Sequence, residues 1–182
     1  MFIHNDNPVK EKHREKLKNY ILDNVGIPES MLTLSADNFL FESKFPEVQI
    51  TSCEFDKKTY RNAIKNKPDN VNLINKDIFH EKPSYEVIWL DLCINLSVKT
   101  INQLISYLQE SQASLISITV QAQREHLSKH LHIYQADSIE DFRVNVFPRL
   151  IYAMTGYKLV KLDRYRTHIN MSMYTFKKPI NL

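Results

Sequence analysis

Three acidic residues, Glu54, Asp77 and Asp91, each follow an apolar run of the kind that forms a buried strand. Where strands and helices alternate, ligands bind just beyond the carboxyl ends of the strands, so binding groups are expected at these positions. Glu54 lies about 20 residues after Ser35, the spacing at which nucleoside-binding sheets place a carboxylate that accepts both ribose hydroxyls. The alternative is a surface glutamate that interacts favourably with a helix N-terminus.

Three histidines form a second candidate group, in the pattern His126-x3-His130-x-His132. In a helix the first two lie one turn apart on the same face, as two metal ligands must. Glu125 precedes His126, so the H-E-x-x-H motif of metalloproteases is absent. We therefore expect a polar, partly exposed helix and no metal site. His126 is still a candidate general base, because an unperturbed imidazole titrates near neutral pH.

Cationic and aromatic residues are interleaved near the C-terminus. Residues 157–182 contain six lysines and arginines but one acidic residue, whereas the whole chain has a net charge of +3. Cations contact phosphates and aromatic rings stack with bases, a combination typical of single-stranded nucleic acid binding. The candidate contacts are Lys161, Arg164, Tyr165 and Arg166. Alternatively, the lysines protect an edge strand from aggregation.

Alternating strands and helices are expected to position these residues. Asn7 and Pro8 begin a helix that Gly26 ends. Apolar runs then predict strands at 31–34, 48–53, 71–75, 85–90, 115–120, 157–165 and 169–176. Helices are expected over 36–45, from Asp56 to 67, over 101–108 and from Ser138 to 155, with a kink at Pro148.

This alternation predicts an α/β fold with a doubly wound, mostly parallel sheet of seven strands. The last two strands are close enough in sequence to form an antiparallel hairpin, and the last strand is expected antiparallel beside the fifth. We expect a single domain over residues 1–182, in which residues 1–29 form a helical N-terminal addition.

The composition excludes several classes of protein. With only Gly26 and Gly156, the chain cannot contain a P-loop or the G-x-G-x-x-G fingerprint of dinucleotide-binding proteins. Two cysteines in apolar runs, Cys53 and Cys93, indicate buried thiols in a reducing compartment. The N-terminus has no apolar signal region, and the longest stretch without charged residues, 111–123, is largely polar. We therefore expect a cytoplasmic protein with no membrane span.

Three motifs carry a family resemblance: the acid Glu54 after the second strand, N-V-N-L-I-N-K-D ending at Asp77, and Y-E-V-I-W-L-D ending at Asp91. Together with the order of elements, they make residues 31–177 resemble a class I S-adenosylmethionine-dependent methyltransferase. The resemblance implies that Glu54 holds the cofactor ribose, that Asp77 contacts the adenine amino group, and that Asp91 opens the catalytic motif. It also implies that the first turn, with Ser35 and Asp37, faces the methionine end of the cofactor.

The chain departs from the family pattern at two motifs. The first motif reads L-T-L-S-A-D-N-F, with Thr33 at the position of the usual acid and no glycine. After the fourth strand the chain reads D-L-C-I from Asp91, where enzymes that methylate base amino groups have two prolines and an aromatic residue.

Two functions follow from this comparison. The first is a divergent methyltransferase that acts on nucleic acid, with S-adenosylmethionine as cofactor and with Asp91 and His126 beside the acceptor. The second is a catalytically inactive module of the same fold that binds nucleic acid or a protein partner. The missing glycines and prolines favour the second function.

Overall fold

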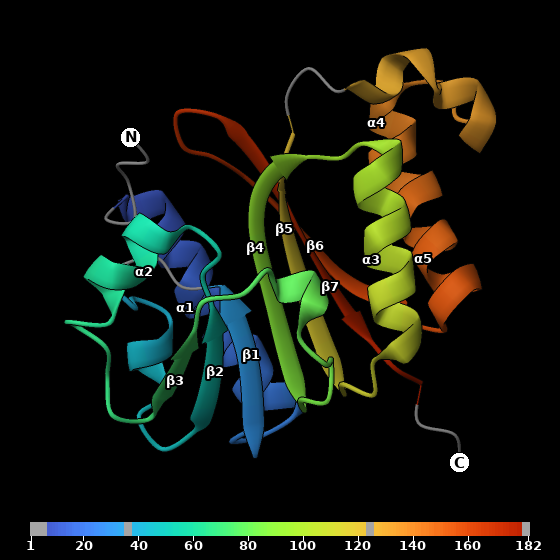
Figure 1. Cartoon of the computed structure of the whole chain (residues 1–182). Coiled ribbons are helices and arrows are strands. Elements are labelled where there is room, and N and C mark those ends of the chain that lie inside the picture. Colours follow the sequence, from blue (N-terminus) through green and yellow to red (C-terminus); the bar gives the residue numbers. More distant parts are fainter. Residues whose placement is uncertain (1–6, 35–37, 123–125, 180–182) are drawn as a thin grey trace.

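The computed structural model describes residues 7–34, 38–122 and 126–179, which form a seven-stranded sheet in the order β3-β2-β1-β4-β5-β7-β6 (Figure 1). The strands are β1 (Ser30–Leu34), β2 (Gln49–Cys53), β3 (Val71–Ile74), β4 (Val87–Asn95), β5 (Leu115–Gln121), β6 (Lys158–Arg166) and β7 (Asn170–Lys177). Strands β1 to β5 are parallel, and β7 is antiparallel to both β5 and β6. This arrangement confirms the predicted fold, including the last strand beside the fifth.

One face of the sheet is covered by α3 (Val98–Glu110) and α5 (Phe147–Thr155), which lie side by side to the right of β4 and β5 in Figure 1. Apolar residues of these helices, such as Leu104, Ile105 and Ile151, pack against Ile88 and Ile116 of the strands. Over β1 to β3 the same face carries, among the described residues, only a short 3-10 helix, η2 (Ile78–His80). The same core also includes Leu32 of β1 and Cys53 of β2, so it extends across the sheet.

The opposite face is covered by α1 (Pro8–Asn24), α2 (Lys57–Ala63) and the 3-10 helix η1 (Glu42–Lys44). Leu17 and Ile21 of α1 are buried in the same cluster as Phe41 and Trp89, whose rings are 4.1 Å apart between centroids. Complete burial of one such side chain contributes about 1.5–3 kcal/mol. The N-terminal helix is thus part of this core.

The helix ends follow the predicted capping residues. The Asn7 side chain accepts a hydrogen bond from the Val9 amide at 2.9 Å, and Gly26, with φ of 86°, follows the end of α1. Ser138 caps α4 (Ile139–Asp141) through the Asp141 amide at 3.0 Å. Before Pro148 the backbone forms a π-helical segment, η5 (Phe142–Val146), which is the expected irregularity in this helix.

The helix expected over 36–45 is wrong for the residues that the structure describes. Residues 38–45 contain only the single turn η1, and Phe39 has a left-handed φ of 49°. Phe39, Phe41 and Phe45 are all buried in the core, and this spacing does not place them on one face of an α-helix. Core packing of the three rings therefore overrides local helix propensity.

Two other expectations need correction. The segment after β5 forms two short 3-10 helices, η3 (His126–Lys129) and η4 (Leu131–Tyr134), and not one α-helix. Strand β4 continues to Asn95, beyond the expected end at residue 90, with a register shift between Asp91 and Asn95. Cys93 lies within this shift and has φ of 48°.

In the described part of the chain, no helix has the length and apolar character needed to span a bilayer.

Candidate functional site

The parallel strands β1 to β5 bring their carboxyl ends to one edge of the sheet. Glu54 follows β2, Asp77 follows β3 and Asp91 lies within β4, two residues beyond Trp89, the last residue that pairs with β1, so all three predicted acids are at this edge. The order of strands reverses between β1 and β4, which is where ligands bind in doubly wound sheets. The edge is therefore the candidate site.

Glu54 is held in place by the backbone around it. Its carboxylate accepts a hydrogen bond from the Asp56 amide at 2.7 Å, and its own amide donates to the Ile74 carbonyl at 3.0 Å. The Asn75 side chain donates to the Glu54 carbonyl at 2.7 Å. These contacts join the ends of β2 and β3. They give the half-buried carboxylate a fixed orientation at the sheet edge.

Phe55, next to Glu54, was missed by the sequence reasoning. Its side chain is 73% exposed, whereas Phe39, Phe41 and Phe45 are fully buried. The signal in the sequence is a single aromatic residue between the acids Glu54 and Asp56, directly after a strand. An exposed ring at this place offers a flat apolar face against which a planar base can stack.

Asp77 is exposed and caps η2, because its carboxylate accepts a hydrogen bond from the Phe79 amide at 3.1 Å. Only Oδ1 takes part in this contact. Asp77 therefore lies on the solvent side of the loop that follows β3, where it can accept a further hydrogen bond from a ligand amino group.

Asp91 is not open to solvent. Its Oδ2 is 2.7 Å from the Lys10 ammonium of α1, and the two side chains are 9% and 13% exposed. The Cys93 thiol donates to Asp91 Oδ1 at 3.2 Å, and the Lys10 ammonium is 3.6 Å from the same sulfur. The first turn of α1 thus covers the acid near the end of β4.

Burial and neighbouring charges shift the pKa values of Lys10 and Cys93 in this cluster. Burial is the largest single effect and works to lower the pKa of Lys10, but the charges of Asp91 and Cys93 and the hydrogen bond to Asp91 together raise that pKa. Burial, together with the negative charge of Asp91, raises the pKa of the Cys93 thiol to about 12. Cys93 is therefore a protonated hydrogen-bond donor near neutral pH and not a nucleophile.

Ser35 and Asp37, predicted to contact the cofactor, lie outside the described residues. Directly before them, the Thr33 hydroxyl donates to the Glu42 carboxyl at 2.6 Å, and Ser52 Oγ is 2.9 Å from Thr33 Oγ1. Glu42 is 2% exposed. Burial raises the pKa of its carboxyl, although the Thr33 hydroxyl opposes the shift. Sequence reasoning missed this cluster because three separate elements contribute to it.

The predicted nucleic-acid contacts do not form one surface. The Tyr165 ring stacks on His13 of α1 at 4.1 Å, and the Lys161 ammonium lies 5.1 Å from the centre of the Tyr20 ring on the same side. Arg164 instead pairs with Glu140 of α4 at 2.6 Å. Side chains alternate between the two faces of β6, so Lys161 and Tyr165 face α1, whereas Arg164 and Arg166 are exposed.

His126, the candidate general base, is the first residue of η3. The residues before it, 123–125, lie outside the described part of the chain. The structure places its backbone in the loop that follows β5. Its proposed role therefore stays a prediction.

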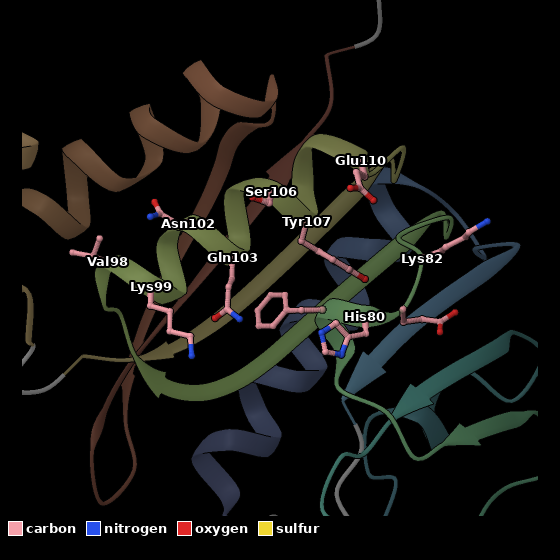
Figure 2. A pocket seen from close by; sticks show the side chains of 11 residues that line it. His80, Lys82, Val98, Lys99, Asn102, Gln103, Ser106, Tyr107 and Glu110 are labelled. Atoms are coloured by element: carbon pink, nitrogen blue, oxygen red, sulfur yellow. The ribbon is translucent and has the colours of Figure 1, made fainter.

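A groove of about 830 Å³ lies between η2 and α3 (Figure 2). Lys99 and Gln103 of α3 point toward the side on which His80 lies. The Tyr107 ring packs edge-on against Phe79 at 5.7 Å, and its buried hydroxyl has no hydrogen-bond partner among the described residues. None of the predicted site residues lines the groove. However, Asp77 accepts a hydrogen bond from the amide of Phe79, which does line the groove, so the groove adjoins the candidate site at the sheet edge.

No protein-family model and no curated protein matches the sequence. Solved structures do match. Magnesium protoporphyrin IX methyltransferase from Synechocystis PCC 6803, with bound S-adenosylhomocysteine, has a TM-score of 0.67 at 8% identity, over 93% of this chain and 83% of that one. The N-methyltransferase NodS from Bradyrhizobium japonicum WM9, with the same ligand, has 0.61 at 12% identity, over 96% and 90%.

A third match, from Pyrococcus horikoshii, is a protein proposed to be an RNA methyltransferase. Its TM-score is 0.61 at 11% identity, over 97% of this chain and 87% of that one. Two of these proteins are named for different acceptors, magnesium protoporphyrin IX and RNA, but each match extends along almost the whole of this chain. The protein therefore has the fold of the class I S-adenosylmethionine-dependent methyltransferases.

Proposed function

We propose that the protein binds S-adenosylmethionine at the carboxyl edge of β1 to β4 and transfers its methyl group to a nucleic acid. The observation that carries this proposal is Glu54, whose carboxylate is held by the Asp56 amide at 2.7 Å directly after β2 in a sheet of this strand order. Two matched structures were determined with S-adenosylhomocysteine, the product that methyl transfer leaves.

The adenosine half of the cofactor fits the residues after β2 and β3. Glu54 accepts hydrogen bonds from the ribose hydroxyls, and Phe55 stacks with the adenine ring. Asp77, which caps η2 in the loop after β3, accepts a hydrogen bond from the adenine amino group. Charge-assisted hydrogen bonds are worth about 1.5–3 kcal/mol each, so Glu54 contributes more than a neutral contact would.

The acceptor lies beside the end of β4. When bound, the cofactor supplies an electrophilic methyl group on a sulfonium sulfur, which passes to the acceptor by in-line displacement. The chain positions the acceptor and receives the proton that the acceptor nitrogen loses. Asp91 is oriented by its ion pair with Lys10, and His126 is the candidate base for the proton.

A nucleic acid is the proposed acceptor because exposed cations lie on the β6–β7 hairpin. Arg164 and Arg166 are both exposed, and one matched structure is proposed to be an RNA methyltransferase. Phosphate contacts of this kind hold a strand without reading its sequence.

The free thiols of Cys53 and Cys93 agree with a reducing, cytoplasmic location.

A second candidate function is an inactive module that binds nucleic acid or a protein partner. The contact between Lys10 and Asp91 favours it, because the ammonium covers the acid that an acceptor would meet. The two functions differ in whether the cofactor binds and reacts.

Thermal unfolding with and without S-adenosylhomocysteine separates them. A ligand at 100 times its dissociation constant adds about 2.7 kcal/mol to the stability of the folded state. We expect the melting temperature to rise with S-adenosylhomocysteine and not with adenine alone at the same concentration. Transfer of labelled methyl groups to RNA then identifies an enzyme. An unchanged melting temperature at millimolar ligand would support the inactive module.

A further inference from the structure

A fully buried carboxyl group joins the ends of the first two strands. Glu42, in η1, is 2% exposed, and its Oε1 accepts a hydrogen bond from Thr33 at 2.6 Å and lies 3.5 Å from Ser52 Oγ. Thr33 and Ser52 are paired residues of β1 and β2. A buried carboxyl is costly unless polar groups satisfy it, and here two hydroxyls from different strands do so.

The position of this carboxyl matches a departure in the sequence. Thr33 stands where the resembling family has the acid of its first motif, immediately before the turn that faces the methionine end of the cofactor. In the structure, the Thr33 hydroxyl donates a hydrogen bond at 2.6 Å to the carboxyl of Glu42, which follows that turn in the sequence. The acid is therefore present at this place in the fold, although another residue contributes it.

We propose that Glu42 replaces the missing acid of the first motif and is a positioning residue for the methionine half of the cofactor. This inference rests on the proposed function. The methionine half carries an ammonium group, which is stabilised by a nearby negative charge, and more strongly in a site shielded from water. Glu42 acts through the hydroxyls of Thr33 and Ser52, which fix the end of β1 from which the turn departs.

The other charged group that faces Glu42 is Arg14 of α1, which is 4% exposed. Its positive charge lowers the pKa of the Glu42 carboxyl, against the larger effect of burial. An ammonium arriving near Glu42 therefore favours the ionised form.

The test compares two ligands that differ only in the methionine half. S-Adenosylhomocysteine carries the amino acid, whereas 5′-methylthioadenosine keeps the adenosine and lacks it. In Glu42→Gln, which retains a hydrogen-bond acceptor for Thr33, we expect affinity for S-adenosylhomocysteine to fall about 10-fold or more. Affinity for 5′-methylthioadenosine should not change. In Glu54→Ala, by contrast, both ligands should bind more weakly.

A rescue variant separates the carboxylate from the packing of Glu42. We expect Glu42→Ala to lose affinity for S-adenosylhomocysteine and Thr33→Asp in the Glu42→Ala background to restore it. Melting temperatures of all variants show that they fold.

Three results would overturn the inference while the proposed function stands. They are unchanged affinity of Glu42→Gln for S-adenosylhomocysteine, an equal loss for both ligands, and a folded double variant without recovery. If the wild-type protein binds neither ligand, the proposed function itself fails.

Discussion

Lys10 and Asp91 form a buried ion pair between the first turn of α1 and the end of β4, with 2.7 Å between the charged atoms. Removing one partner of such a pair leaves an uncompensated charge, which costs more than the pair contributes. We therefore expect Lys10→Met to lower the free energy of unfolding by about 3–5 kcal/mol, measured by urea denaturation.

Lys16→Met is the matched control, because Lys16 lies on the same helix but is 45% exposed and 4.0 Å from Asp163. Its effect should stay below about 1 kcal/mol. Equal losses in the two variants would show that Asp91 does not depend on Lys10.

Glu42 predicts a pH dependence of stability. Burial raises the pKa of its carboxyl above the ordinary value of 4.5, so the folded state binds the proton more tightly than the unfolded chain does. The contribution of Glu42 to folding is therefore greatest below pH 4.5 and declines as the pH rises toward the folded-state pKa. Glu42→Gln has no proton to lose at this position.

The measurement is the difference in unfolding free energy between the wild-type protein and Glu42→Gln at several pH values. We expect the difference to move in favour of Glu42→Gln as the pH rises from 4 to 8. A difference that does not change with pH would contradict a raised pKa for Glu42.

At the residue scale, the sequence predicts that the acids lie at the sheet edge, but it does not predict which residues contact them. Glu54 and Asp77 follow apolar strands, and the ends of such strands can be read from the chain. Asp91 pairs with Lys10, and Thr33 pairs with Glu42. In both cases the partner lies in another element of the fold. No periodicity connects them, because these contacts arise only when the helices pack on the sheet.

At the element scale, the β6–β7 hairpin carries the testable claim about nucleic acid. Arg164 and Arg166 are exposed, whereas Tyr165 is stacked on His13. We expect the double variant Arg164→Ala/Arg166→Ala to bind single-stranded RNA more weakly, by a similar factor for all sequences, because phosphate contacts carry no sequence information. Fluorescence anisotropy over a salt series measures this, with a shallower salt dependence expected for the variant.

Arg149→Ala is the control, since Arg149 is an exposed cation that lies on α5 and not on the hairpin strands. If it weakens RNA binding as much as the double variant does, the hairpin is not the contact surface. Binding of the wild-type protein that does not change between low and physiological salt would lead to the same conclusion.

The elements that were predicted well have strong local signals. The α1 helix has Asn7, Pro8 and Gly26 at its ends, and α3 has a regular apolar stripe. The segment after β1 has no such agreement, because Phe39, Phe41 and Phe45 are all buried in one core at a spacing that does not fit one face of a helix. Tertiary packing determines the structure of this segment, which also contributes to the candidate site.

At the scale of the whole molecule, the alternation of strands and helices determined the topology. Parallel neighbours need crossover connections, and these are right-handed, which leaves few arrangements for a chain of this pattern. The fold is accordingly shared with structures that are 8–12% identical to this chain. The chemistry depends on a few side chains at one edge, so the shared fold does not determine the acceptor.

The central claim is that the cofactor binds at this edge through Glu54, and calorimetric titration with S-adenosylhomocysteine tests it most directly. We expect Glu54→Ala to weaken binding about 10- to 150-fold, because charge-assisted hydrogen bonds to the ribose are lost. Stability should change by no more than about 1 kcal/mol. Asp77→Ala should cost less, since it contacts one amino group.

Glu47→Ala is the matched control, because Glu47 is an exposed glutamate just before β2, at the opposite edge of the sheet. The account predicts wild-type affinity for this variant and the stated loss for Glu54→Ala. Binding by the wild-type protein that survives Glu54→Ala unchanged would contradict the proposed position of the site.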